Sequence, residues 1–93
     1  MQNNVRVRVL VSGEVQGVFL RHNIKEQAKM LRLKGWVKNL PDGKVEAVVE
    51  GEKEIIETII KWVRQGPFLS RVDSIKVDWQ EARGEFDDFQ ILY

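Results

Sequence analysis

The order of strand-like and helix-like segments is the feature that most restricts how this chain can fold. Residues 5–11 place a valine at every second position, which predicts a strand with one buried face. Residues 36–40 and 44–50 flank a Pro-Asp-Gly turn signal at 41–43, so they predict a β-hairpin. Residues 75–79 alternate again and predict a further strand.

Two other segments have apolar residues at the spacing of one helical face. The first begins near Leu20, and we expect Gly35 to end it. The second covers roughly residues 53–65 and is followed by Gly66-Pro67, which stops a helix. The apolar stripes are Leu20, Ile24, Ala28 and Leu31 in the first segment and Ile56, Ile59, Ile60 and Val63 in the second.

The resulting order is β-α-β-β-α-β, with a short edge strand as an optional addition at residues 89–93. It predicts an α+β fold, a ferredoxin-like sandwich in which two helices cover one face of an antiparallel sheet of four to five strands. The 93 residues are about the length of one domain, so we expect residues 1–93 to form a single domain.

Composition excludes several kinds of catalytic site. The chain has 0 cysteines and 1 histidine, which excludes disulfides, thiolate nucleophiles, cysteine-bound zinc and a multi-histidine metal site within one chain. His22 could form a serine triad only with Ser12, Ser70 or Ser74, and none of these lies in a G-x-S-x-G elbow. Asp87-Asp88 is better explained as a turn or edge-protecting charge than as a metal site.

Charge and hydropathy limit the partners and the location. The chain has 15 basic and 14 acidic residues, a net charge of +1, which gives no general attraction to nucleic acid or anionic membranes. The N-terminal residues lack the apolar run of a signal peptide, and no stretch approaches the length of a membrane span. By exclusion we expect a cytoplasmic protein that binds neither nucleic acid nor membrane.

The loop before the first predicted helix is a candidate anion site. Gly13 and Gly17 allow sharp turns that bring backbone N–H groups toward one point. The loop leads into a helix N-terminus, whose partial positive charge suits a phosphate or a carboxylate. The same residues also fit a plain strand–helix connection, because the segment is neither a Walker loop nor a Rossmann fingerprint.

Two polar side chains near this loop occupy positions that a ligand would explain. Arg21 is a cation in a first helical turn, where the helix dipole disfavours it unless an anion is bound. Asn39 lies near the end of a strand, where asparagine is uncommon, and its amide can position a water. Alternatively, Arg21 is a solvated surface residue and Asn39 caps the following turn.

Two longer stretches resemble the signature motifs of the acylphosphatases. Gly-Glu-Val-Gln-Gly-Val-Phe-Leu-Arg (13–21) is similar to the first motif, and Gly-Trp-Val-Lys-Asn-Leu-Pro-Asp-Gly-Lys-Val-Glu (35–46) is similar to the second. Gly66-Pro67 and the closing Phe-Gln-Ile-Leu-Tyr (89–93) also resemble that family, so the resemblance covers about residues 5–93.

The resemblance implies hydrolysis of the carboxyl–phosphate bond of a small acyl phosphate, without metal or cofactor. Inorganic phosphate would be the product and a competitive inhibitor, and we expect a monomer. Arg21 is the signature arginine, which would hold the phosphate, and Asn39 is the signature asparagine, which would orient the attacking water. The phosphate would also be cradled by the backbone N–H groups of Val15, Gln16, Gly17, Val18, Phe19 and Leu20.

Leu20 departs from the family pattern, because members usually carry an aromatic residue before the arginine. Phe19 stands where a small residue or phenylalanine is common. Both positions stay apolar, so we expect altered packing with activity retained, and we assign His22 no role. No side chain near these residues is an evident general base. Substrate-assisted proton transfer, with positioning and charge stabilisation by the protein, would suffice for such a substrate.

Two alternative functions share the predicted topology. RNA-recognition modules have the same element order, and Arg6 and Arg8 would lie on the open sheet face. However, residues 44–50 carry glutamates and no stacking aromatic residue, which departs from the RNA-binding signature. An acylphosphatase-like regulatory or ligand-binding domain is the other alternative, and the presence of both Arg21 and Asn39 argues against it.

Overall fold

The computed structural model describes residues 4–17, 19–67 and 70–93, which form five strands and two helices. The order of these elements is the predicted one and includes the extra strand near the C-terminus. In chain order they are β1 (Asn4–Glu14), α1 (Leu20–Met30), β2 (Lys34–Asn39), β3 (Val45–Glu52), α2 (Lys53–Arg64), β4 (Arg71–Glu81) and β5 (Phe89–Leu92).

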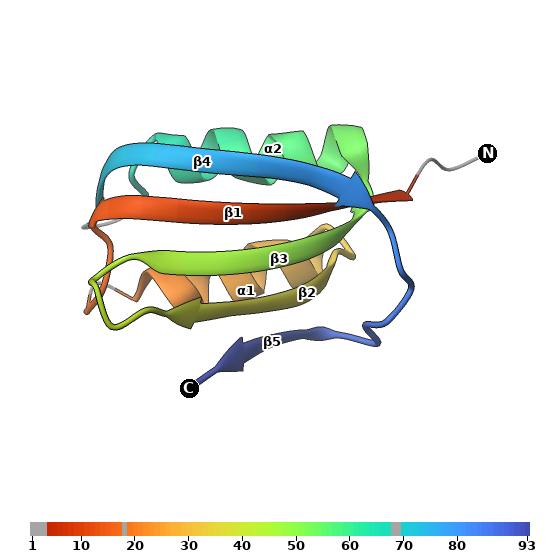
Figure 1. The fold of residues 1–93 in the computed structure, drawn as a ribbon, viewed down its shortest axis with the longest axis horizontal. Helices are drawn as coiled ribbons and strands as arrows, with labels where there is room; N and C mark the ends of the chain where they lie inside the picture. The colour runs from red at the N-terminus through yellow and green to blue at the C-terminus, as the bar shows by residue number, and fades with distance from the viewer. Residues whose placement is uncertain (1–3, 18, 68–69) are drawn as a thin grey trace.

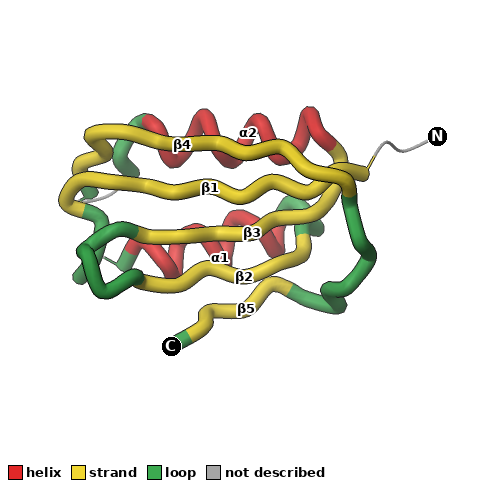
Figure 2. Tube along the Cα trace, in the orientation of Figure 1, coloured by secondary structure: helices red, strands yellow, loops and turns green. Residues whose placement is uncertain are grey.

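The strands form one sheet in the order β4-β1-β3-β2-β5, and both helices pack on the same face (Figure 1). The tube view shows the same two layers, with the hairpin between β2 and β3 projecting at one end of the sheet (Figure 2). Alternate residues of β1, namely Val7, Val9 and Val11, are buried in one cluster with Ile24 of α1 and Ile56 of α2. The α+β, ferredoxin-like fold class is therefore confirmed.

The fifth strand corrects one detail of that prediction, because the sheet is mixed and not purely antiparallel. β5 pairs in parallel with β2, from Gly35↔Phe89 to Lys38↔Leu92. The chain leaves β4 at the end of the sheet where β2 begins, crosses that end and returns beside β2 (Figure 1). Phe89 is completely buried, which fixes the start of β5 to the core.

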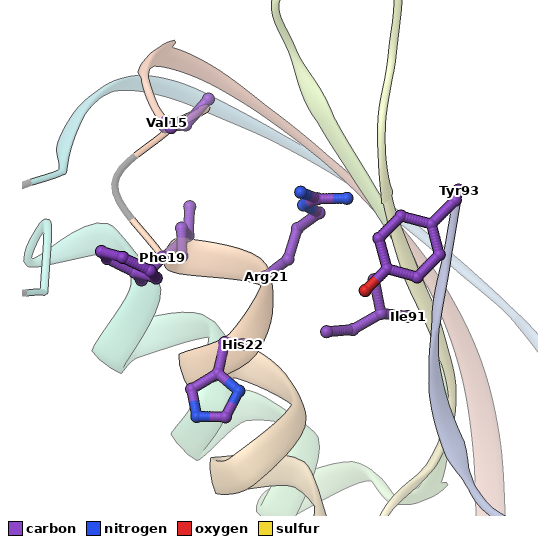
Figure 3. Close-up of a pocket in the computed structure, with 8 residues that line it drawn as sticks. Val15, Phe19, Arg21, His22, Ile91 and Tyr93 are labelled. Carbon is purple, nitrogen blue, oxygen red and sulfur yellow. The ribbon is translucent and has the colours of Figure 1, made fainter.

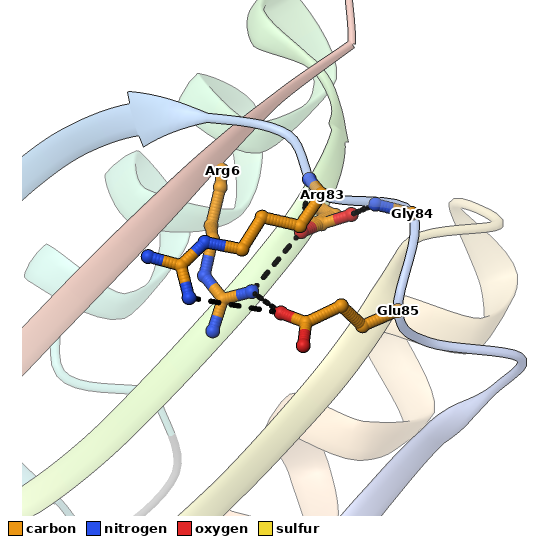
Figure 4. A network of polar contacts seen from close by, with 5 residues as sticks. Arg6, Arg83, Gly84 and Glu85 are labelled. Atoms are coloured by element: carbon orange, nitrogen blue, oxygen red, sulfur yellow. Dashed lines mark hydrogen bonds and ion pairs between the residues drawn. The ribbon is translucent and has the colours of Figure 1, made fainter.

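The crossing segment between β4 and β5 is held to the sheet by the carboxylate of Glu50. This side chain is only 8% exposed. Its two oxygens accept hydrogen bonds from the backbone N–H groups of Arg83 and Gly84, both at 3.0 Å. The Arg6 guanidinium donates to the same carboxylate at 3.3 Å and to Glu85 at 2.6 Å (Figure 4). Glu50 therefore anchors the segment that delivers β5 to the edge of the sheet.

The end of α1 differs from the prediction that Gly35 terminates this helix. The helix ends at Met30, and Arg32 takes the left-handed conformation with φ 58°. The N–H of Leu33 donates to Ala28 O at 2.8 Å, which is the Schellman arrangement, and the Leu33 side chain is buried. The burial of Leu33 supports a conformation that is uncommon for arginine. Gly35 lies in β2, where it pairs with β3 and β5.

Candidate active site

The loop from β1 to α1 turns through two residues with positive φ. Gly17 has φ 72° and Phe19 has φ 61°, and Phe19 is not a glycine. Left-handed backbone at such a residue costs of order 1–3 kcal/mol and collects at ligand-binding segments. Val15 and Leu20 are buried on either side of these turns, so the core holds the loop at both ends. Val18, which the sequence places in the phosphate loop, lies outside the described residues.

The N-terminus of α1 is suited to an anion. Phe19 is the N-cap residue, its side chain forms no capping hydrogen bond, and the first turn contains no acidic residue. The first N–H groups of a helix lack intrahelical acceptors and carry partial positive charge. This end of α1 can therefore take a phosphate or carboxylate oxygen.

Arg21 projects from this helix end into a cavity of about 340 Å³. Figure 3 shows its guanidinium extending into the space between the β1–α1 loop and the chain that carries Ile91 and Tyr93, whereas Phe19 and His22 point away from it. The Arg21 Cζ atom lies 5.3 Å from the centre of the Tyr93 ring. None of the ion pairs between described residues involves Arg21, so this cation is available to a ligand. The cavity is lined by Val15, Gly17, Phe19, Leu20, Arg21, His22, Ile91 and Tyr93.

Asn39 ends β2, the strand next to β5. Its Oδ1 atom is buried and has no hydrogen-bond partner among the described residues. Most buried polar atoms in proteins are paired, so this carbonyl oxygen has an unused capacity to accept a hydrogen bond. Asn39 is not one of the residues that line the Arg21 cavity, but it follows Lys38, which pairs with Leu92 between the lining residues Ile91 and Tyr93.

The Gln16 side chain joins the loop to the turn that follows Asn39. Its Nε2 donates to Leu40 O and to Lys44 O, each at 2.8 Å. The turn itself is closed by the bond from Leu40 N to Lys44 O, also at 2.8 Å. The Lys44 N–H donates to Asp42 Oδ1 at 3.1 Å, and this bond, helped by the Lys44 ammonium, lowers the pKa of the exposed Asp42 carboxyl.

The structure therefore gathers the loop, Arg21 and the Asn39 turn at one end of the sheet, while their roles in binding and catalysis remain predictions. Ile91 and Tyr93 line the cavity although the predicted site did not include them. A signal was present, because alternation along residues 89–93 puts both on the same face as the buried Phe89. The bridging contacts of the Gln16 side chain were not predicted either, because its partners lie far along the chain.

Leu20, the predicted departure from the family pattern, is almost completely buried in the core cluster. Its side chain therefore contributes to packing beneath the loop.

Among the described residues, no group of three or more His, Asp or Glu side chains is placed to hold a metal ion. In the same part of the chain, no helix has both the length and the apolar character needed to cross a membrane.

The fold and the site define a ferredoxin-like α+β protein with a cationic pocket at one end of its sheet. The family model for acylphosphatase matches residues 7–91. An acylphosphatase of Anaeromyxobacter dehalogenans is 43% identical over 93 residues, which is 100% of both chains. An acylphosphatase of Aeropyrum pernix is 51% identical over 90 residues, covering 96% of this chain and 89% of that protein.

The solved structure of an acylphosphatase from Bacillus subtilis is 34% identical and superposes with a TM-score of 0.91, covering 96% of this chain and 99% of the other. The chain belongs to the acylphosphatase family. It is a hydrolase that splits acyl phosphates into a carboxylate and inorganic phosphate.

Proposed function

We propose that the backbone of the loop at residues 15–20 and the side chain of Arg21 hold the phosphate group of the acyl phosphate. We also propose that Asn39 directs the attacking water at phosphorus. The phosphate would meet the N-terminal N–H groups of α1 and the Arg21 guanidinium in the same cavity. A guanidinium can give two parallel hydrogen bonds to a phosphate. Inorganic phosphate would bind the same groups and so compete with substrate.

The observation that carries the role of Asn39 is its buried Oδ1 atom, which has no partner among the described residues. Rotation of the Asn39 amide toward the cavity would let a water donate one hydrogen to this oxygen while the water's own lone pair faces the phosphorus. Water held in line in this way gains rate through orientation, an effect that can be worth several kcal/mol of the barrier.

The reaction balances without a protein base. The water oxygen forms a bond to phosphorus, and the bond between phosphorus and the acyl oxygen breaks. The leaving group departs as a carboxylate with the electron pair of that bond. One water proton passes to a phosphate oxygen of the substrate and the other stays on the incoming oxygen, giving dihydrogen phosphate. The protein supplies positioning and positive charge.

The test is an assay of acyl-phosphate hydrolysis in the presence of EDTA, comparing the wild type with Asn39→Ala. We expect kcat to fall by about 100-fold or more, because each 1.36 kcal/mol of lost barrier reduction is tenfold in rate. The inhibition constant of inorganic phosphate should change much less. Asn23→Ala, on α1 and outside the cavity lining, is the matched control and should keep its kcat.

Two outcomes would contradict the assignment. A near-native kcat for Asn39→Ala would remove the water-positioning role. A parallel fall of kcat, phosphate affinity and denaturant midpoint would make Asn39 a structural residue of the turn. A monomeric state and a cytoplasmic location remain predictions from the sequence.

A further inference from the structure

The Gln16 amide uses its full donor capacity on one short piece of backbone. Its Nε2 carries two hydrogens, and these reach Leu40 O and Lys44 O at 2.8 Å each. Two carbonyl oxygens require donors, so the NH₂ end of the amide is the one that fits here. The contacts span 24 and 28 residues of sequence, from the β1–α1 loop to the β2–β3 turn.

These contacts bridge two elements that the sheet does not join directly. β1 and β2 are not neighbours, because β3 lies between them in the sheet. The loop follows β1 and Asn39 ends β2, so the backbone ladders connect the two halves of the site indirectly, through Val45 of β3, which pairs with Val11 and with Asn39. The Gln16 side chain adds a direct contact to Leu40, the residue directly after Asn39.

We infer that Gln16 is a positioning residue: its side chain sets the distance and orientation of Asn39 relative to the phosphate loop. This inference rests on the proposed roles of the loop and of Asn39. Leu40 and Asn39 share a peptide bond, so a carbonyl fixed at Leu40 limits how far the Asn39 side chain can drift. Misplacement of a reacting group by about 1 Å can reduce the rate by about 100-fold.

The side chain and the backbone of Gln16 serve separate tasks. The proposed phosphate contact of this residue is its backbone N–H, which every substitution except proline retains. A change to the side chain therefore tests the link to Asn39 while the phosphate donor stays in place. Gln16→Met has a similar length and shape and lacks both donors.

The decisive experiment is a double-mutant cycle of Gln16→Met and Asn39→Ala, with kcat and the inhibition constant of inorganic phosphate measured for all four proteins. We expect Gln16→Met alone to lower kcat by roughly 10- to 100-fold and to change the phosphate inhibition constant by less than about 3-fold. In the Asn39→Ala background the same substitution should change kcat by less than about 3-fold, because the residue through which Gln16 acts is gone.

Equal losses of kcat in both backgrounds would overturn the inference, and so would a phosphate inhibition constant that rises in step with the loss. A native kcat for Gln16→Met would also overturn it. These results differ from failure of the proposed function, in which Asn39→Ala itself keeps its kcat.

Gln16→Glu provides a second readout that does not depend on the folding of the first variant. The protonated carboxyl has one O–H donor, whereas the carboxylate has none and faces two carbonyl oxygens. The ratio of its kcat to the wild-type kcat should therefore rise as pH falls toward the glutamate range, near about 4.3 in model peptides. A ratio that is independent of pH would count against the positioning role.

Discussion

Glu50→Gln should destabilise the protein strongly although the two side chains have nearly the same shape. The carboxylate accepts from two backbone N–H groups and from Arg6. A glutamine has one acceptor oxygen, so its NH₂ group must face either the Arg83 or the Gly84 N–H. Hydrogen bonds to charged groups contribute about 1.5–3 kcal/mol, and a buried donor left unpaired costs about 1–3 kcal/mol.

Since Arg6 keeps Glu85 as a partner, we expect a loss of about 3 kcal/mol in the free energy of unfolding. A domain of this size loses about 4–8 °C of Tm for each kcal/mol, so Tm should fall by about 12–24 °C. Denaturant unfolding with an unchanged m-value would measure the same quantity at fixed temperature.

Glu85→Gln is the matched control, because Glu85 also pairs with Arg6 but its side chain is 52% exposed. Exposed ion pairs contribute about 0–1 kcal/mol, so this variant should stay within about 1 kcal/mol of the wild type. Equal losses for the two variants, or a loss below about 1 kcal/mol for Glu50→Gln, would refute the reasoning that burial and the backbone donors give Glu50 its importance.

Three further predictions concern the site and its support. Arg21→Ala should weaken phosphate binding by roughly 10- to 100-fold for each lost charged hydrogen bond, while the denaturant midpoint of the variant stays native. Near-native kinetics of this variant would show that Arg21 is not part of the site. Inorganic phosphate should raise Tm, with about 2.7 kcal/mol of added stability at 100 times its Kd, and chloride at matched ionic strength should not. Gly35→Ala should lower the free energy of unfolding by roughly 2–4 kcal/mol, because Gly35 has φ 140° and an added Cβ would lie 1.8 Å from Val48 O. A loss below about 1 kcal/mol in a denaturant titration would contradict this prediction.

The sequence was sufficient to predict the order of elements because alternation and helical spacing are local properties. It also identified Arg21 and Asn39 as residues of interest, since each stands where its type is locally unfavourable. The direction of β5 could not be predicted in the same way. Whether a short strand runs parallel or antiparallel to its neighbour depends on the path of the preceding connection, and here that path is fixed by Glu50.

The errors in detail have similar physical causes. Glycine is the usual residue at the end of a helix, so Gly35 was the expected stop, but Arg32 took the left-handed position because Leu33 is buried directly after it. The role of the Gln16 side chain had no local signal, because its two acceptors lie 24 and 28 residues away in the sequence. Contacts of this kind follow from tertiary structure alone.

The position of β1 between β3 and β4 has a consequence for folding kinetics. Val7 pairs with Val49 on one side and with Trp79 on the other, so both partners of this interior strand are distant in sequence. Such pairings require large loops to close before they stabilise the chain, which slows folding. We therefore expect the loop that follows β1 to be completed only once these pairings have formed. If the loop forms late, a phosphate bound there should slow unfolding while leaving the folding rate nearly unchanged, which folding and unfolding rates measured with and without phosphate would test.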